Sequence, residues 1–250
     1  MGLFVLILAF LGGFSQSNGS ATRPPIPVPE SVVMCTAFEA DDSSKSAHCK
    51  NLGSKVITAF VYRDVDNPLL VGWVDVASPG LQSGKTYPVV VPPSSPLDRL
   101  QIDAVIFADG THTGSSPDPA RNNEDVVEEI FEWRQAQAQA WAEWRQQIVA
   151  LPADDSKAIQ AFLESVSGLQ DTGPATSIEQ AGRDKVVDEL IRQARSIKDA
   201  LEKITAYRTS GNTAEVVLTP KEIRESLIDN WVIKRSEVAH ARSLNAGESR

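Results

Sequence analysis

The chain has 250 residues, 42% of them hydrophobic, and carries a formal net charge of -9. A chain of this length can build one large hydrophobic core or two modest ones, and we expect two domains. The acidic balance argues against a nucleic-acid partner, because binding to a phosphate backbone requires clustered Lys and Arg side chains, and the sequence contains no such cluster.

The chain begins with an apolar run from Leu3 to Phe14, followed by small and polar residues. About 12 apolar residues fit the core of a secretory signal peptide and fall short of the roughly 20 that are needed to cross a bilayer. No Lys or Arg precedes the run, which departs from the usual pattern. We expect residues 1–21 to be a signal peptide cleaved after Ala21. The alternatives are cleavage after Ser17, an uncleaved anchor and a buried terminal helix. The mature protein would then be secreted, periplasmic or bound to the cell envelope, without a stable membrane span.

Residues 22–30, "TRPPIPVPE", form a proline-rich extended lead. Both cysteines, Cys35 and Cys49, lie after it. In an oxidising compartment two cysteines this close in sequence favour a disulfide, which stabilises by about 3 kcal/mol in the chain-entropy model. The alternative is a metal or redox site that also uses His48 and His112. We favour the disulfide, because the chain has no C-x-x-C pair and adjacent residues rarely ligate the same ion.

Residues 31–115 are predicted to form an antiparallel β-sandwich of the Ig-like type. Short runs rich in β-branched and aromatic residues alternate there with polar, glycine-rich or proline-rich stretches, at the spacing expected of such a domain. The runs are "SVVMCTAFEA", "KVITAFVYR", "LLVGWVDV", "TYPVVVP" and "LQIDAVIFADG". Within "ITAFVY" both alternating faces carry bulky side chains, which is typical of a central strand.

The stretch "SPGLQSGKTY", residues 78–87, is similar to a phosphate-binding loop. That loop needs two glycines separated by four residues, then Lys and Ser or Thr, before a helix. Here three residues separate Gly80 from Gly84, and the following "TYPVVVPP" cannot open a helix. We therefore predict a turn between two strands, in which the glycines supply backbone freedom.

Residues 116–244 are predicted to form a helical bundle or coiled-coil-like helices, because the apolar period changes there to about 3.6. Helices are expected over 119–151, from 154 to about 168, over 177–207, and from 219 onward. Ser177 and Gln180 form a capping-box pattern at the third helix. That helix also carries a heptad seam, made of Leu190, Ala194, Ile197, Leu201 and Ile204. We expect an exposed hinge over 113–123 and a disordered tail over 245–250.

The segments "KNLGSKVITAFVY" and "IDAVIFADGTHTG" resemble a pattern found in uncharacterised secreted bacterial proteins, in which a small β-sandwich precedes a helical region. The resemblance covers residues 31–115. It implies a fold and a compartment, and it implies no activity and no site residues.

The tetrapeptide "EWRQ" occurs twice, eleven residues apart, in the first predicted helix. Eleven residues are close to three helical turns, so the copies project within about 20° of each other. Trp133, Trp141 and Trp144 then share one helical face. We favour packing of this face on the sheet or on the heptad helix. The alternative is an exposed aromatic ridge that stacks on sugars or docks a partner.

No catalytic, cofactor-binding or metal-binding residues are assigned. Asp109 and His112 in "FADGTHTG" resemble an acid and a base, but no nucleophile motif accompanies them, and we predict a tight turn. We expect an α+β protein that is a non-catalytic binding module with a protein or glycan partner. A helical assembly or scaffold protein is the second hypothesis, and an unrecognised hydrolase is the third.

Overall fold

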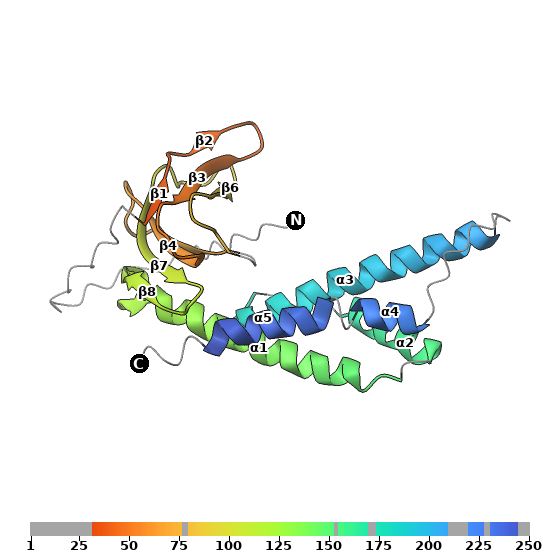
Figure 1. Cartoon of the computed structure of the whole chain (residues 1–250). Helices are drawn as coiled ribbons and strands as arrows, with labels where there is room; N and C mark the ends of the chain where they lie inside the picture. The colour runs from red at the N-terminus through yellow and green to blue at the C-terminus, as the bar shows by residue number, and fades with distance from the viewer. Residues whose placement is uncertain are drawn as a thin grey trace. The chain divides into compact units, whose positions relative to one another are not determined.

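A computed structural model describes residues 32–76, 80–152, 155–169, 174–209, 220–227 and 231–244 (Figure 1). The predicted signal peptide, the proline-rich lead and the C-terminal tail lie outside these residues. The described chain is mixed α+β, with antiparallel sheets in its first half and helices in its second. It divides into two compact units, and the division lies between Ile130 and Phe131.

The first unit is built from short antiparallel strands. They are β1 (Val33–Cys35), β2 (Glu39–Ala40), β3 (Lys45–Asn51), β4 (Ile57–Asp64), β5 (Val71–Asp75), β6 (Thr86–Val91), β7 (Leu100–Phe107), β8 (His112–Gly114), β9 (Pro117–Asp118) and β10 (Glu124–Asp125). In one sheet β3 pairs with β1, β2 and β6, and in another the order is β5-β4-β7-β8. A two-stranded sheet joins β9 to β10.

The two larger sheets share one hydrophobic core. As predicted, "ITAFVY" is a central strand: β4 lies between β5 and β7, and Ile57, Phe60 and Tyr62 are buried. Val89 and Val91 of β6, in the other sheet, belong to the same cluster. The rings of Phe60 and Tyr87 meet edge to face with centroids 6.5 Å apart, so β4 and β6 are in contact through their side chains.

The segment that resembled a phosphate-binding loop connects β5 to β6 and therefore passes from one sheet to the other. Its described part begins at Gly80. Gly80 and Gly84 have φ angles of +85° and +71°, which glycine adopts without steric cost. Leu81 between them is buried and pairs with Ile57. A strand follows the glycines where a phosphate-binding loop requires a helix, so this segment is a turn, as predicted.

The start of the first long helix differs from the prediction. Pro119–Arg121 form a short 3-10 helix, and α1 begins only at Val126. Asn122 and Asn123 adopt left-handed φ angles of 59° and 66°, which end the 3-10 turn.

The predicted exposed hinge over 113–123 is also wrong in part, because Ser116 is fully buried. The backbone N–H of Val126 donates to the carbonyl of Ser116 (3.1 Å), and Arg121 forms an ion pair with Glu129. These contacts hold the first turn of α1 in the first unit, which is why the division falls inside this helix and after the predicted boundary at residue 115.

The helices are α1 (Val126–Val149), α2 (Ser156–Ser167), α3 (Ile178–Thr209), α4 (Pro220–Leu227) and α5 (Ile233–Leu244). The core of the second unit takes residues from α1, α2, α3 and α5. In the heptad seam of α3, Leu190 and Ala194 are buried, and Ile197 and Leu201 pack against the same cluster, so the seam serves this unit's own core. The side chain of Ile204 lies outside the described part.

Two local features explain how α3 begins and how closely it packs. The N–H of Gln180 donates to the Ser177 hydroxyl (3.1 Å), as a capping box requires, while the Gln180 side chain accepts from Thr176. At Gly182 a Cβ atom would lie 2.6 Å from the carbonyl oxygen of Trp133 and 2.9 Å from the Cβ of Ala136. Glycine therefore lets the backbones of α3 and α1 come into contact.

Candidate functional site

The tryptophan face of α1 lies largely in the core of the helical unit. Trp141 is 2% exposed and meets Trp231 edge to face at 5.2 Å. Trp144 is half-buried and meets the ring of Phe162 at 6.3 Å. Trp133 is also half-buried. Trp141 and Trp144 therefore pack internally, and the structure does not bring the three indoles together as an exposed ridge.

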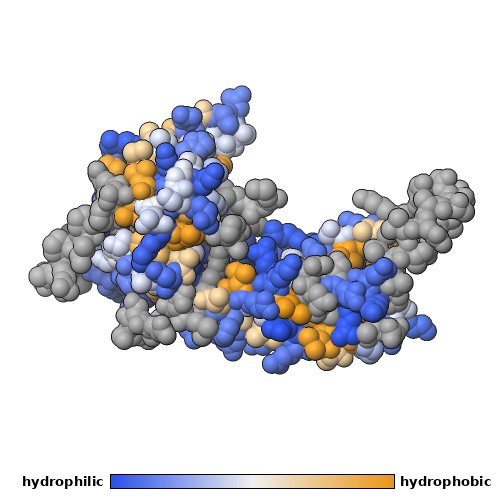
Figure 2. Space-filling view, in the orientation of Figure 1, coloured by the Kyte–Doolittle hydropathy of each residue, from blue (hydrophilic) through white to orange (hydrophobic). Residues whose placement is uncertain are grey.

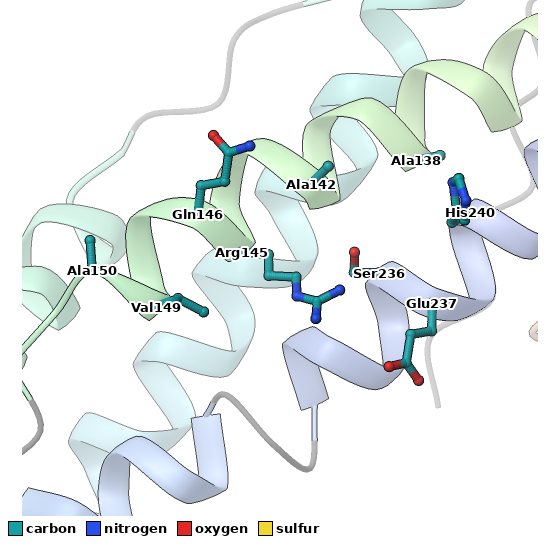
Figure 3. A pocket seen from close by; sticks show the side chains of 9 residues that line it. All are labelled: Ala138, Ala142, Arg145, Gln146, Val149, Ala150, Ser236, Glu237 and His240. Atoms are coloured by element: carbon teal, nitrogen blue, oxygen red, sulfur yellow. The ribbon is translucent and has the colours of Figure 1, made fainter.

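A groove lies elsewhere on α1, between this helix and α5 (Figure 3). Its volume is about 680 Å³. From α1 it is lined by Ala138, Ala142, Arg145, Gln146, Val149 and Ala150, and from α5 by Ser236, Glu237 and His240. Most of these side chains are small or apolar. The hydropathy surface shows apolar patches along the helical unit, separated by hydrophilic side chains (Figure 2).

The sequence of α1 places largely different residues in the core and in the groove, and Ala138, which packs against the core and lines the groove, lies at the border of the two faces. Ala140, Trp141 and Ile148 face the core. The groove residues 138, 142, 145 and 149 follow each other at steps of four, three and four, which also defines one helical face. On α5, Val232 just before the helix and Ala239 within it enter the core, while Ser236 and His240 line the groove one turn apart. Each helix thus carries a core face and a groove face.

The polar side chains that line the groove lack partners within the described part of the chain; they are those of Arg145, Gln146, Ser236, Glu237 and His240. Arg145 and Glu237 are exposed, and neither forms an ion pair with a described residue. Ser236 is 6% exposed, and its hydroxyl points into the groove without a hydrogen bond to any described residue. Arg145 extends from α1 toward α5 in Figure 3. The groove therefore offers a guanidinium, a carboxylate, a hydroxyl, an amide and an imidazole to whatever occupies it.

Ser236 and His240 also belong to residue types that act in nucleophilic catalysis. Covalent catalysis requires a hydrogen bond between nucleophile and base, with the base oriented by a third group. No hydrogen bond joins Ser236 to His240 or His240 to Glu237 among the bonds of the described residues. Among the described residues, Ser236, His240 and Glu237 are therefore not joined by the hydrogen bonds that such a set requires.

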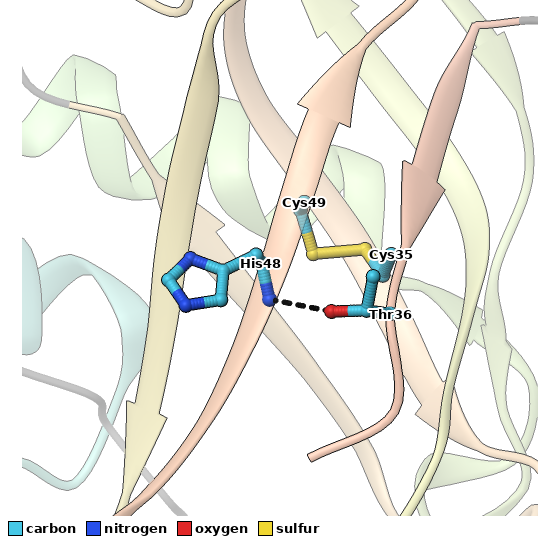
Figure 4. Close-up of a disulfide and its surroundings, with 4 residues drawn as sticks. All are labelled: Cys35, Thr36, His48 and Cys49. Atoms are coloured by element: carbon cyan, nitrogen blue, oxygen red, sulfur yellow. Dashed lines mark hydrogen bonds between the residues drawn. A yellow bond between two sulfur atoms is a disulfide. The ribbon is translucent and has the colours of Figure 1, made fainter. Parts of the chain in front are cut away.

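The predicted disulfide is confirmed (Figure 4). Cys35 of β1 and Cys49 of β3 are directly opposite in the strand register, with Cα atoms 4.0 Å apart. The N–H of Thr36 donates to the carbonyl of His48 (3.2 Å), and the N–H of His48 donates to the Thr36 hydroxyl (3.2 Å). Within the described ranges, no group of three or more His, Cys, Asp or Glu side chains is placed to hold a metal ion.

Asp109 and His112 do not form an acid–base pair. The Asp109 carboxylate accepts hydrogen bonds from Lys55 Nζ (2.7 Å) and from the N–H and hydroxyl of Thr111. These bonds, that of Lys55 first, lower the pKa of Asp109 to about 2. His112 begins strand β8. Asp109 thus stabilises the turn between β7 and β8, which agrees with the predicted tight turn.

A buried polar cluster in the first unit was not predicted. Asp103 of β7 is 4% exposed and accepts from Arg63 Nε and from the Ser116 hydroxyl (3.1 Å). Burial raises the pKa of Asp103, against the opposing effect of Arg63. One terminal nitrogen of Arg63 is buried without a partner in the described chain. The sequence feature that could have indicated this buried ion pair is an acidic residue, Asp103, inside the apolar run "LQIDAVIF".

In the described ranges, none of the helices combines the length and the apolar character that crossing a bilayer requires. Comparisons of this chain with models of protein families, with curated proteins and with solved structures find no match.

Proposed function

We propose that this protein is a non-catalytic binding module of the secretory or cell-envelope compartment, and that the groove between α1 and α5 binds a helix of a protein partner. The observation that carries the proposal is the lining of this groove, where small side chains lie beside Arg145 and Glu237, neither of which forms an ion pair with a described residue. Small residues allow helices to approach closely, and unpaired charges select a partner of matching charge pattern.

A protein partner is favoured over a glycan. Sugar binding by stacking uses exposed aromatic rings, and the indoles of Trp141 and Trp144 pack within the core. The groove itself is lined by alanines, Val149 and polar side chains and contains no indole.

The compartment is part of the proposal. It rests on the apolar segment at the start of the chain, on the Cys35–Cys49 disulfide and on the resemblance to secreted bacterial proteins of similar organisation. The finer description of the fold is also proposed. The core shared by two antiparallel sheets supports an Ig-like β-sandwich, and the core shared by four helices supports a helical bundle.

Site-specific photo-cross-linking of the full chain tests the proposal. A photoreactive phenylalanine derivative replaces Ala142 in the groove, and Lys157, an exposed residue of α2, carries it in the control. In cells that produce the protein naturally, irradiation should join residue 142 to a helix-forming peptide, identified by mass spectrometry, and Arg145→Glu should abolish the product. The proposal is refuted if residue 142 forms no protein adduct, or if residue 157 gives the same one.

A helical assembly protein is the second candidate. It is favoured by the same two charges, because a groove that carries both a cation and an anion is able to match another copy of itself.

A further inference from the structure

We propose that the helix bound by the groove is supplied by a second copy of this chain. In this dimer α1 and α5 of one copy pack against α5 and α1 of the other about a two-fold axis, so that Arg145 of each copy lies opposite Glu237 of the other. The inference rests on the proposed function in one respect, namely that the groove binds a protein helix.

Charge complementarity identifies the second copy as the occupant. Two neighbouring charges on these helices are paired within one chain: Glu143 binds Arg183 (3.0 Å), and Arg235 binds Glu189 (3.0 Å). Arg145 and Glu237 form no ion pair with the described chain, although both line one groove. A two-fold axis makes every contact occur twice with the partners exchanged, so Arg145 and Glu237, which pair with no described residue, both gain a partner in one symmetric contact.

The side chains on the groove face of α1 suit helix–helix contact. Residues 138, 142, 145 and 149, which are Ala, Ala, Arg and Val, repeat at the four-three-four spacing of a helix seam. Val149 is 53% exposed, so this apolar side chain is available to an incoming helix. Alanines at the first two positions permit a close approach of two helices, which is the packing of antiparallel four-helix bundles.

The Ser236 hydroxyl is a second observation that points to an occupant. Ser236 is only 6% exposed, its hydroxyl points into the groove, and that hydroxyl lacks a hydrogen bond to any described residue. A helix that covers the groove must supply a partner, because a buried hydroxyl without one is costly. Gln146 lines the same groove, and an amide on a facing helix is able to donate to this hydroxyl.

Sedimentation equilibrium on the full mature protein tests the inference. We expect the wild type to dimerise, and Arg145→Glu and Glu237→Arg each to weaken dimerisation about tenfold or more, because each puts two like-charge contacts into the interface. An equimolar mixture of the two variants should dimerise again. In the mixed dimer the new glutamate at position 145 of one copy faces the new arginine at position 237 of the other. At the second, symmetric contact the native Glu237 of the first copy faces the native Arg145 of the second. Lys157→Glu is the matched control and should dimerise like the wild type. Circular dichroism establishes that each variant is folded.

Two results overturn the inference: a wild-type protein that remains monomeric at every soluble concentration, or a mixture of variants that fails to dimerise while the wild type does. Sedimentation and cross-linking together distinguish failure of the dimer from failure of the proposed binding function. If the wild type is monomeric while residue 142 cross-links to a different protein, the second copy is excluded and the binding groove stands. If residue 142 forms no adduct at all, both proposals fail.

Discussion

The ring of Tyr62 covers Gly72, its partner in the register of β4 and β5. A Cβ atom at position 72 would lie 2.7 Å from the Cζ atom and from the hydroxyl oxygen of Tyr62. The glycine thus makes room for a tyrosine that is only 2% exposed. Tyr62 belongs to the hydrophobic core of the first unit.

Gly72→Ala should therefore destabilise the protein by about 1 to 3 kcal/mol, because the ring of Tyr62 must leave its position to avoid the added methyl group. Urea denaturation measures the change. Gly53→Ala is the control: its Cβ would find its nearest neighbour at 3.5 Å, an ordinary contact, and its effect should stay within about 0.5 kcal/mol. Equal effects of the two substitutions would contradict the role assigned to Gly72.

Tyr62 also predicts how the protein responds to alkali. Burial raises the pKa of Tyr62 to about 12, from an ordinary value of 10.0. Because the folded-state pKa is the higher one, this contribution to stability is complete below pH 10 and is lost as the pH rises toward 12. A titration of tyrosinate absorbance should show a step near pH 12, or with unfolding, that belongs to Tyr62. Burial also raises the pKa of Tyr87, so a variant is needed to assign the step. Tyr62→Phe should remove that step, and its persistence in the variant would contradict the assignment.

Gly182→Ala should destabilise the helical unit by about 1 to 3 kcal/mol. The added methyl group would lie 2.6 Å from a backbone carbonyl, that of Trp133, which cannot rotate away as the end of a side chain would. Thermal denaturation followed by circular dichroism measures the loss. Ser196→Ala on the exposed side of α3 is the matched control and should change little. A Gly182→Ala protein as stable as the wild type would show that α1 and α3 have room to separate.

Trp141→Ala should cost about 3 to 5 kcal/mol of stability, because it removes a fully buried indole and leaves a cavity beside Trp231. Trp144→Ala should cost less, since Trp144 is half-buried. Chemical denaturation of the two variants gives the comparison. If Trp144→Ala lowered the stability more than Trp141→Ala, Trp144 would have to make contacts in addition to those with the core of this unit.

Replacing Cys35 and Cys49 together by Ser should lower the free energy of unfolding by about 3 kcal/mol in the chain-entropy model, for a sequence separation of 14 residues. The same loss should follow reduction of the wild type. Urea denaturation with and without a dithiol reductant provides the measurement. The double Ser variant should show no response to the reductant, and a further loss there would point to an effect outside the disulfide.

The sequence predicts those parts of this protein that depend on local pattern. "ITAFVY" has bulk on both faces and forms a central strand, and the Ser177 hydroxyl accepts a hydrogen bond at the start of α3. The start of α1 was missed, because Asn122 and Asn123 take left-handed conformations that helical periodicity does not reveal.

The groove could not be predicted, since α5 lies far from α1 in the sequence. The absence of an ion pair for Arg145 or Glu237 within the described chain is a property of the packed helices. The same holds for Asp103, whose partners Arg63 and Ser116 come from separate segments. Sequence pattern gives the elements and their buried faces, while such pairings emerge only from tertiary packing.

The position of the disulfide has a consequence for the order in which the first unit assembles. Cys35 and Cys49 face each other across neighbouring strands, and β2 between them pairs with β3, so this part of the sheet involves only nearby residues. It is able to close before β6 joins it. Once oxidised, the bridge prevents a one-residue slip of β1 against β3, which would turn Val33 out of the core and expose the opposite face of the strand.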